Sequence, residues 1–138
     1  MSSKEAITEF MEKEFPQSSV IILEVSRMGA KIKQKIGFNE LRPGGTVSGP
    51  VMMTVADAAM YVAILGEIGL VALAVTTSLT INFLRKPSPT RDLIAQCELL
   101  KVGKSLAVGE VHLYSEGIGE PVAHVVATYS IPPRNSAK

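Results

Sequence analysis

The stretch PVMMTVADAAMYVAIL, residues 50–65, decides the fold of this chain. Its length and composition predict a helix that is apolar on almost every side. Such a helix must be covered on most sides, so the rest of the chain is expected to wrap around it. Asp57 lies in the middle of the stretch and is the only charged residue between Arg42 and Glu67.

Asp57 is the first candidate for a functional residue. Burying an isolated carboxylate is costly, so we expect it to be paired, neutralised or placed where water or a ligand can reach it. Carboxylates in such surroundings often belong to functional sites. The alternative without catalysis is a carboxylate that a strand hydroxyl holds, or one that contacts a partner chain.

Predicted strands lie on both sides of this helix in the sequence. We expect Ser48 or Gly49 to cap the helix, Pro50 to take its first position, and Gly66 and Gly69 to end it. The predicted elements are a helix at Ser3–Phe15, strands at Val20–Arg27 and Lys31–Ile36, a loop at Asn39–Ser48, the central helix at Val51–Leu65, and strands at Val71–Leu84, Leu93–Val102, Ser105–Ser115 and Pro121–Ile131.

Tight turns join the last three predicted strands, at residues 103–104 and 117–119. Short connections favour antiparallel neighbours. One curved antiparallel sheet wrapped around the central helix satisfies the short connections and also covers the apolar helix. The expected class is therefore α+β with a single domain over residues 1–138. The tail from Pro132 to Lys138 is expected to fray.

The composition excludes several classes of function. Fourteen Lys and Arg residues balance 13 Asp and Glu residues, so no charge excess indicates a nucleic acid or a membrane surface as partner. The N-terminus lacks the apolar core of a signal peptide. The 15 residues of Val51–Leu65 fall short of the roughly 20 that a membrane span needs. We therefore expect a cytoplasmic protein without a membrane segment.

The cysteine and histidine content gives no metal site. Cys97 is the only cysteine and is expected to be a small buried hydrophobic residue. His112 and His124 lie in predicted strands without the spacing of metal ligands, so we expect each to be structural or exposed. We therefore predict no metal.

The segment from Arg42 to Asp57 contains the main candidate catalytic groups. A glycine at a helix N-terminus, here Gly49, can offer its N–H to a developing negative charge. Asp57 lies eight residues further on, about 12 Å along the helix axis at ~1.5 Å per residue. Both groups cannot act on one carbonyl within one helix. If they cooperate, Gly49 of one subunit must face Asp57 of another, which predicts a dimer with sites at its interface.

Three segments carry a family resemblance. They are Gly49–Ala63, Ile81–Pro87 and Lys101–Ala107. Their order and spacing resemble the hotdog-fold acyl-CoA thioesterases of the phenylacetate-pathway, or PaaI-like, type, over roughly Phe38–Ile131. The resemblance implies a hotdog fold, in which a curved sheet wraps one long hydrophobic helix. It also implies homodimers joined through their sheet edges, often paired as tetramers, and an acyl- or aryl-CoA substrate.

The resemblance also implies roles for single residues. Asp57 would orient or activate water, or attack the thioester, and the N–H of Gly49 would polarise the thioester carbonyl. A strand hydroxyl would assist the acid. The spacing of the family's motif places this hydroxyl at Thr76, whereas the alternation of side chains along the strand puts Thr77 on the face toward the helix, and both stay open. The family's side-chain amide is replaced here by Arg42, which can still donate hydrogen bonds.

The remaining predicted residues bind substrate. The family's His-Gly-Gly reads Ser48-Gly49-Pro50 in this chain. The predicted substrate-binding set is Arg42, Ser48, Pro50, Asn82, Phe83, Arg85, Lys86 and Lys104, in which the basic residues would hold the phosphates of coenzyme A. For each basic residue taken singly, a solvated turn is an equal alternative. No cofactor is implied beyond the coenzyme A of the substrate.

Two other functions remain open. The altered Ser48-Gly49-Pro50 motif and Arg42 are compatible with a non-catalytic protein that binds acyl-CoA or lipid. A hotdog dehydratase or hydratase would need a histidine beside the acid, and sequence order places His112 and His124 poorly for that.

Overall fold

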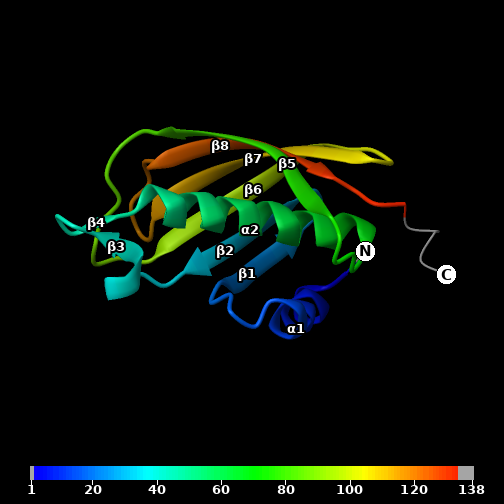
Figure 1. Ribbon diagram of the computed structural model, residues 1–138, viewed down its shortest axis with the longest axis horizontal. Helices are drawn as coiled ribbons and strands as arrows, with labels where there is room; N and C mark the ends of the chain where they lie inside the picture. Colours follow the sequence, from blue (N-terminus) through cyan, green and yellow to red (C-terminus); the bar gives the residue numbers. More distant parts are fainter. Residues whose placement is uncertain (1, 134–138) are drawn as a thin grey trace.

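Helix α2 (Gly49–Ile68) lies across one face of a six-stranded antiparallel sheet in the computed structural model, which describes residues 2–133 (Figure 1). The strand order is β1-β2-β6-β7-β8-β5. The strands are β1 (Ile21–Ser26), β2 (Gly29–Gln34), β5 (Val75–Phe83), β6 (Leu93–Val102), β7 (Leu106–Ser115) and β8 (Ala123–Ser130). The predicted α+β architecture, one sheet against one apolar helix, is confirmed.

Smaller elements complete the chain. Helix α1 (Lys4–Glu14) begins at its predicted cap, where Ser3 Oγ accepts a hydrogen bond from Ala6 N at 3.1 Å, and it packs beside β1. The predicted loop before α2 contains a 3-10 helix, η1 (Phe38–Glu40), and a short hairpin of β3 (Leu41–Arg42) and β4 (Thr46–Val47). Of the tail expected to fray, residues 134–138 lie outside the described residues.

The core lies between α2 and the sheet. Met60 and Ile64 of α2 are fully buried, as are Leu113 of β7 and Val125 of β8. Buried and half-buried residues alternate along β7, because successive side chains of a strand point to opposite faces. The sheet therefore has an inner face toward α2 and an outer face away from it.

The central helix is longer than predicted because Gly66 does not end it. Gly66 lies inside α2, where a Cβ atom would come within 2.8 Å of Val25 Cγ1, so the position needs a residue without a side chain. Gly69, at φ +98°, ends the helix instead. With 20 residues, α2 is long and apolar enough to cross a membrane by length and composition alone. The core helix of a folded domain meets the same criterion, and α2 is mostly buried.

Strand β5 begins later than predicted. Residues 71–74 form a turn, and the hydroxyl of Tyr61 donates to the carbonyl oxygens of Val71 (3.3 Å) and Ala72 (3.2 Å). These contacts hold the turn against α2, so pairing with β8 starts only at Val75. The strand before the central loop is likewise displaced, from the predicted Lys31–Ile36 to Gly29–Gln34, because β1 and β2 join in a tight turn at Met28 (φ +57°).

Candidate active site

The carboxylate of Asp57 is held by two hydroxyl groups, one from each strand of the β5–β8 pair. Thr76 Oγ1 on β5 donates to Asp57 Oδ1 at 2.5 Å, and the Tyr129 hydroxyl on β8 donates to the same oxygen at 2.8 Å. Tyr129 also reaches the Asp57 backbone oxygen at 3.0 Å. Asp57 Oδ2 has no hydrogen-bond partner among residues 2–133, so it is available to water or a ligand.

A β-bulge decides which threonine meets the acid. Thr76 pairs with Tyr129, but the next pair is Ser78 with Thr128, so Thr77 is the extra residue. The bulge resets the alternation and places Thr76 on the same face as Leu79, toward the core. Thr77 instead donates to the backbone oxygen of Thr128 at 3.3 Å. The threonine in contact with Asp57 is therefore Thr76, the one that spacing indicated. Strand alternation indicated Thr77 because it assumed a regular strand without a bulge.

Sequence reasoning missed Tyr129. It follows Val125 and Ala127 on the inner face of β8, and is itself buried. Burial, and then the negative charge of Asp57, raise the pKa of Tyr129, which stays a neutral donor at ordinary pH. A tyrosine at an inward position of a strand should seek a partner for its hydroxyl, and Asp57 is the nearest acid. That alternation was the available signal.

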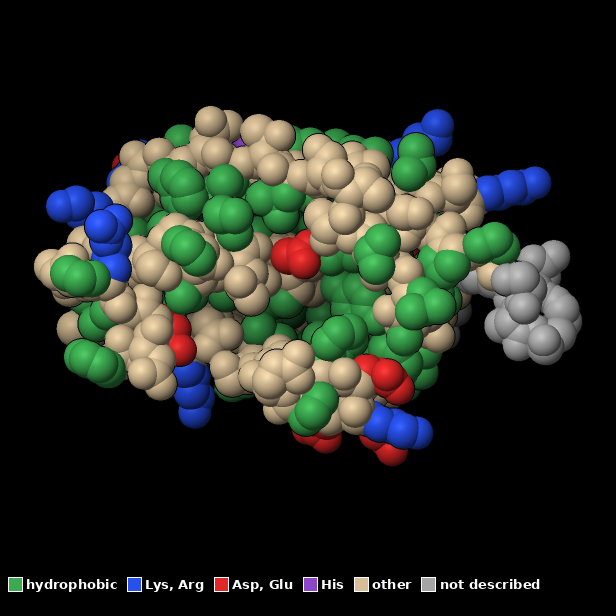
Figure 2. Space-filling view, in the orientation of Figure 1, with side chains coloured by type: hydrophobic (Ala, Val, Ile, Leu, Met, Phe, Trp, Pro, Cys, Tyr) green, Lys and Arg blue, Asp and Glu red, His purple; other side chains and the backbone are tan. Residues whose placement is uncertain are grey.

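A cavity of about 760 Å³ opens beside Asp57. Its lining comes mainly from the end of α1 and the loop after it, from α2, and from the turn after α2 with the start of β5; it includes Phe15, Thr54, Tyr61 and Thr76. Figure 2 shows the hollow on this face of the molecule, with hydrophobic side chains inside it and acidic atoms at its edge. The arrangement puts a hydrogen-bonded carboxylate at a predominantly apolar chamber.

The Gly49 half of the predicted site lies at the start of α2, whereas Asp57 lies near the middle of the helix. Ser48 is the cap, with its Oγ accepting from Val51 N at 3.2 Å, so Pro50 takes the second helical position. A Cβ atom on Gly49 would come within 3.2 Å of the Phe83 ring, which brings these two predicted residues together. Within one chain, Gly49 and Asp57 remain about two helical turns apart on α2.

The remaining predicted substrate-binding residues are exposed. Arg42 lies on the short hairpin before α2, and Asn82 and Lys86 lie at the end of β5 and just beyond it. Arg85 donates to the Pro121 backbone oxygen. Lys104 lies in the β6–β7 turn, at the opposite end of the sheet from Arg85. One chain therefore does not bring this set to a single place.

The two histidines lie next to each other and beside a carboxylate, an arrangement that their spacing in the sequence did not indicate. His112 and His124 face each other across β7 and β8, and His124 Nε2 lies 2.8 Å from Glu110 Oε1. The positions of the histidines in the sequence did not reveal this cluster, because its members come together across two neighbouring strands. Since their positions alternate with the buried residues of the same strands, both histidines lie on the outer face, away from Asp57. Neither stands beside the acid as a hydratase would require.

Comparison with known proteins identifies the family. A sequence model of the thioesterase superfamily matches residues 44–122, more than half of the chain. A search of curated proteins finds no match.

Similar solved structures support this assignment. A candidate thioesterase from Silicibacter sp. TM1040 is 43% identical, with a TM-score of 0.88 over 95% of this chain and 92% of that chain. The PaaI protein of the E. coli phenylacetic acid degradation operon is 20% identical, with a TM-score of 0.75 over 91% and 92% of the two chains. A Streptococcus mutans protein bound to acetyl CoA is 16% identical, with a TM-score of 0.75 over 84% and 90%. The chain therefore belongs to the thioesterase superfamily and has the PaaI-like hotdog fold.

Proposed function

We propose that this protein hydrolyses the thioester bond of an acyl- or aryl-coenzyme A at a site shared between two subunits. The observation that carries the proposal is the Asp57 carboxylate, which Thr76 and Tyr129 orient at one oxygen and which has no hydrogen-bond partner among residues 2–133 at the other. A carboxylate oriented in this way at an apolar chamber can act on a bound acyl group.

The proposed reaction has two routes from the same arrangement. In the first, Asp57 Oδ2 takes a proton from water as the water oxygen attacks the thioester carbonyl. In the second, Oδ2 attacks the carbonyl itself, and water then hydrolyses the acyl-enzyme. In both, the carbon–sulfur bond breaks and coenzyme A leaves as its thiol. The sulfur gains the proton that Asp57 took from water in the first route and a proton from solvent water in the second. The carboxylic acid is then released. Neither route needs a metal or redox cofactor.

The partner subunit would supply the carbonyl-polarising group. The N–H of Gly49 lies at the start of α2, where the helix dipole favours developing negative charge. Because Gly49 and Asp57 of one chain are two turns apart, the Gly49 that serves a given Asp57 must come from a second copy.

Strand β5 offers the surface for that association. It is an edge strand, nine residues long, and Val75 and Phe83 on it are about half exposed. An exposed, partly apolar edge of this length is a template for pairing with another strand. We therefore propose that two copies join through β5 to form a continuous sheet, which carries the two halves of each site toward each other.

The substrate class rests on two observations. The chamber beside Asp57 has predominantly apolar surroundings, which suits an acyl or aryl group. A protein of the same fold binds acetyl CoA. Arg42, Arg85, Lys86 and Lys104 are exposed cations that would meet the phosphates of coenzyme A at the mouth of the assembled site.

The test is an assay of purified protein against a panel of acyl- and aryl-CoA thioesters, with a chromogenic disulfide reporting the released thiol. Asp57→Asn is expected to lower turnover roughly 100-fold or more, because it removes the base or nucleophile while keeping the shape. Burial raises the pKa of the Cys97 thiol to about 12, so the protein's own cysteine contributes little background.

Circular dichroism should show that Asp57→Asn remains folded. Wild-type turnover that persists in the folded variant would contradict the proposed role of Asp57. If the wild-type protein binds an acyl-CoA tightly and releases no thiol, the non-catalytic binding function is correct instead.

A further inference from the structure

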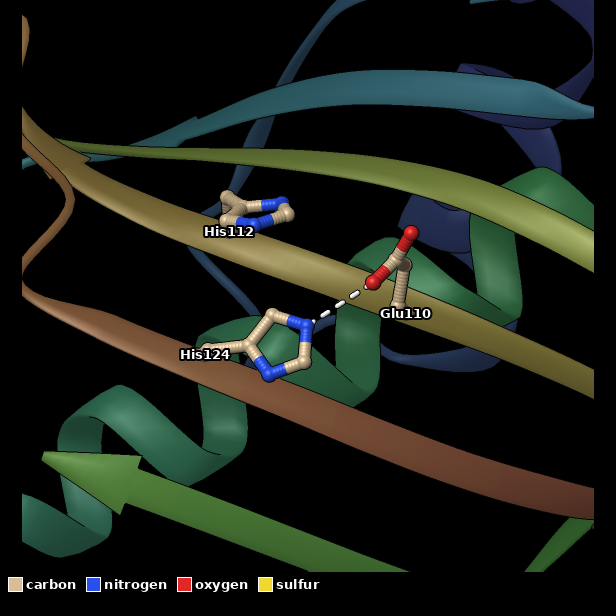
Figure 3. Close-up of side chains that lie close together, drawn as sticks. All are labelled: Glu110, His112 and His124. Carbon is tan, nitrogen blue, oxygen red and sulfur yellow. Dashed lines mark hydrogen bonds and ion pairs between the residues drawn. The ribbon is translucent and has the colours of Figure 1, made fainter.

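Glu110, His112 and His124 form a cluster on the outer face of the sheet, on the opposite side from Asp57 (Figure 3). Glu110 and His112 are two residues apart on β7 and therefore share a face. His112 pairs directly with His124 of β8, and Glu110 lies diagonally across from His124. The sheet register alone brings two imidazoles and a carboxylate together.

The distances within the cluster suit a metal ion. The ligand atoms of the three residues all lie within 4.8 Å of one another, and the two imidazole ring centroids are 4.7 Å apart. Ligands bound tetrahedrally at about 2.0–2.1 Å lie roughly 3.3 Å from each other. All three side chains are half-buried, so small side-chain rotations can close the remaining gap.

The surrounding charge favours a cation. Glu98 of β6 lies directly opposite Glu110, and like charges in this position repel. Among residues 2–133, no Lys or Arg forms an ion pair with either glutamate. A bound divalent cation would offset this repulsion and take the place of the contact between His124 and Glu110.

We propose that this cluster binds one Zn²⁺ ion per chain, through the two imidazoles and the carboxylate, with water in the fourth position. Two nitrogen ligands and one oxygen ligand suit zinc better than magnesium or calcium, which prefer all-oxygen sites. The ion would link β7 to β8 from the face opposite the candidate active site. The proposal does not depend on the proposed hydrolysis.

The test is isothermal titration with zinc chloride of protein without a polyhistidine tag, after treatment with a chelator. The wild-type chain is expected to bind one equivalent and to gain thermal stability with added zinc. His112→Ala, His124→Ala and Glu110→Gln should each weaken binding at least about tenfold, because losing even a second-shell partner of a ligand costs about 10–100-fold. Cobalt(II) in place of zinc should give the visible absorption of a four- or five-coordinate ion.

Two control variants define the location of the site. Glu120→Gln makes the same chemical change in the exposed turn before β8 and should bind zinc as the wild type does. Asp57→Asn should also leave zinc binding unchanged, since Asp57 lies across the sheet. The proposal is wrong if the wild type shows no saturable binding near one equivalent. It is equally wrong if both histidine variants bind as the wild type does, or if Asp57→Asn abolishes the binding.

Discussion

At the scale of single residues, a β-bulge in β5 gives the neighbouring residues Thr76 and Thr77 different contacts. Thr76 donates to Asp57, whereas Thr77, one residue later, donates to a backbone oxygen in β8. The two side chains are chemically identical, so only their placement in the strand decides which of them contacts Asp57. They form a matched pair for mutation.

We predict that Thr76→Val lowers the turnover of thioester hydrolysis by roughly 10–100-fold. A hydrogen bond to a charged group contributes about 1.5–3 kcal/mol, and each 1.4 kcal/mol corresponds to a factor of about ten. Thr77→Val should change turnover by less than about twofold. The measurement is kcat on the best substrate of the panel, with circular dichroism as the control for folding. Equal losses in the two variants would contradict the assignment of Thr76.

At the scale of elements, α2 keeps one stripe that its own chain does not fully cover. Pro50, Met53 and Thr54 are exposed, and Asp57 and Ala58 are half-buried, at the spacings of one helix face. Four of these five residues line the cavity. The middle of the helix is otherwise buried, so this stripe is where a substrate or a second copy can reach the acid.

The opposite side of α2 approaches the sheet very closely at Gly109 of β7. A Cβ atom there would lie 2.8 Å from Met60 Sδ, 3.0 Å from Leu99 Cδ2 and 3.1 Å from the Glu98 backbone oxygen. The glycine therefore sets how near the helix lies to the sheet.

We predict that Gly109→Ala lowers the free energy of unfolding by about 1–3 kcal/mol, the usual cost of overpacking a core. Met60 can move aside, but the backbone oxygen cannot do so without disturbing the pairing of β6 with β7. Gly119→Ala is the control, because nothing lies within 4 Å of the added atom. Urea denaturation should show a lower midpoint for Gly109→Ala alone, and equal midpoints would show that the core accepts the extra methyl group.

At the scale of the whole molecule, one chain carries both halves of the proposed site at separate places. Asp57, near the middle of α2, contacts Thr76 and Tyr129. Gly49, at the start of α2, lies against Phe83. A two-fold dimer presents the same surface from both copies, so each copy would complete one site of the other and the proposed dimer would contain two sites. This symmetry allows the shared site to be tested without a structure of the complex.

We predict that mixing two inactive variants restores activity. Asp57→Asn lacks the acid, and in Gly49→Val the new side chain crowds the space beside the polarising N–H and the Phe83 ring. Half of the dimers in an equal random mixture contain one chain of each kind, and each such dimer has one intact site. Turnover should therefore recover to about a quarter of the wild-type value.

The chains should be mixed by co-expression, and mass spectrometry should verify that mixed dimers form. Each variant alone, shown to be folded, is the control. If mixed dimers form and no activity returns, each chain contains its own complete site and the proposal of a shared site is wrong.

The sequence by itself determined the architecture and the family, and it singled out Asp57 as the candidate acid. A 20-residue apolar helix can be covered only by wrapping the rest of the chain around it, and alternating residues can make only strands with one inward face. Asp57 could be singled out because a lone carboxylate in that helix is costly. These properties are local, so composition and periodicity reveal them.

Only the tertiary structure decided that Thr76 and Tyr129 contact Asp57 and that Glu110 lies beside the two histidines. A bulge shifts strand parity without leaving a mark in the hydrophobic pattern. Tyr129 lies 72 residues from Asp57 in sequence, and His124 lies 14 from Glu110. Which side chains meet across strands depends on sheet order and register, and packing of the whole chain sets both.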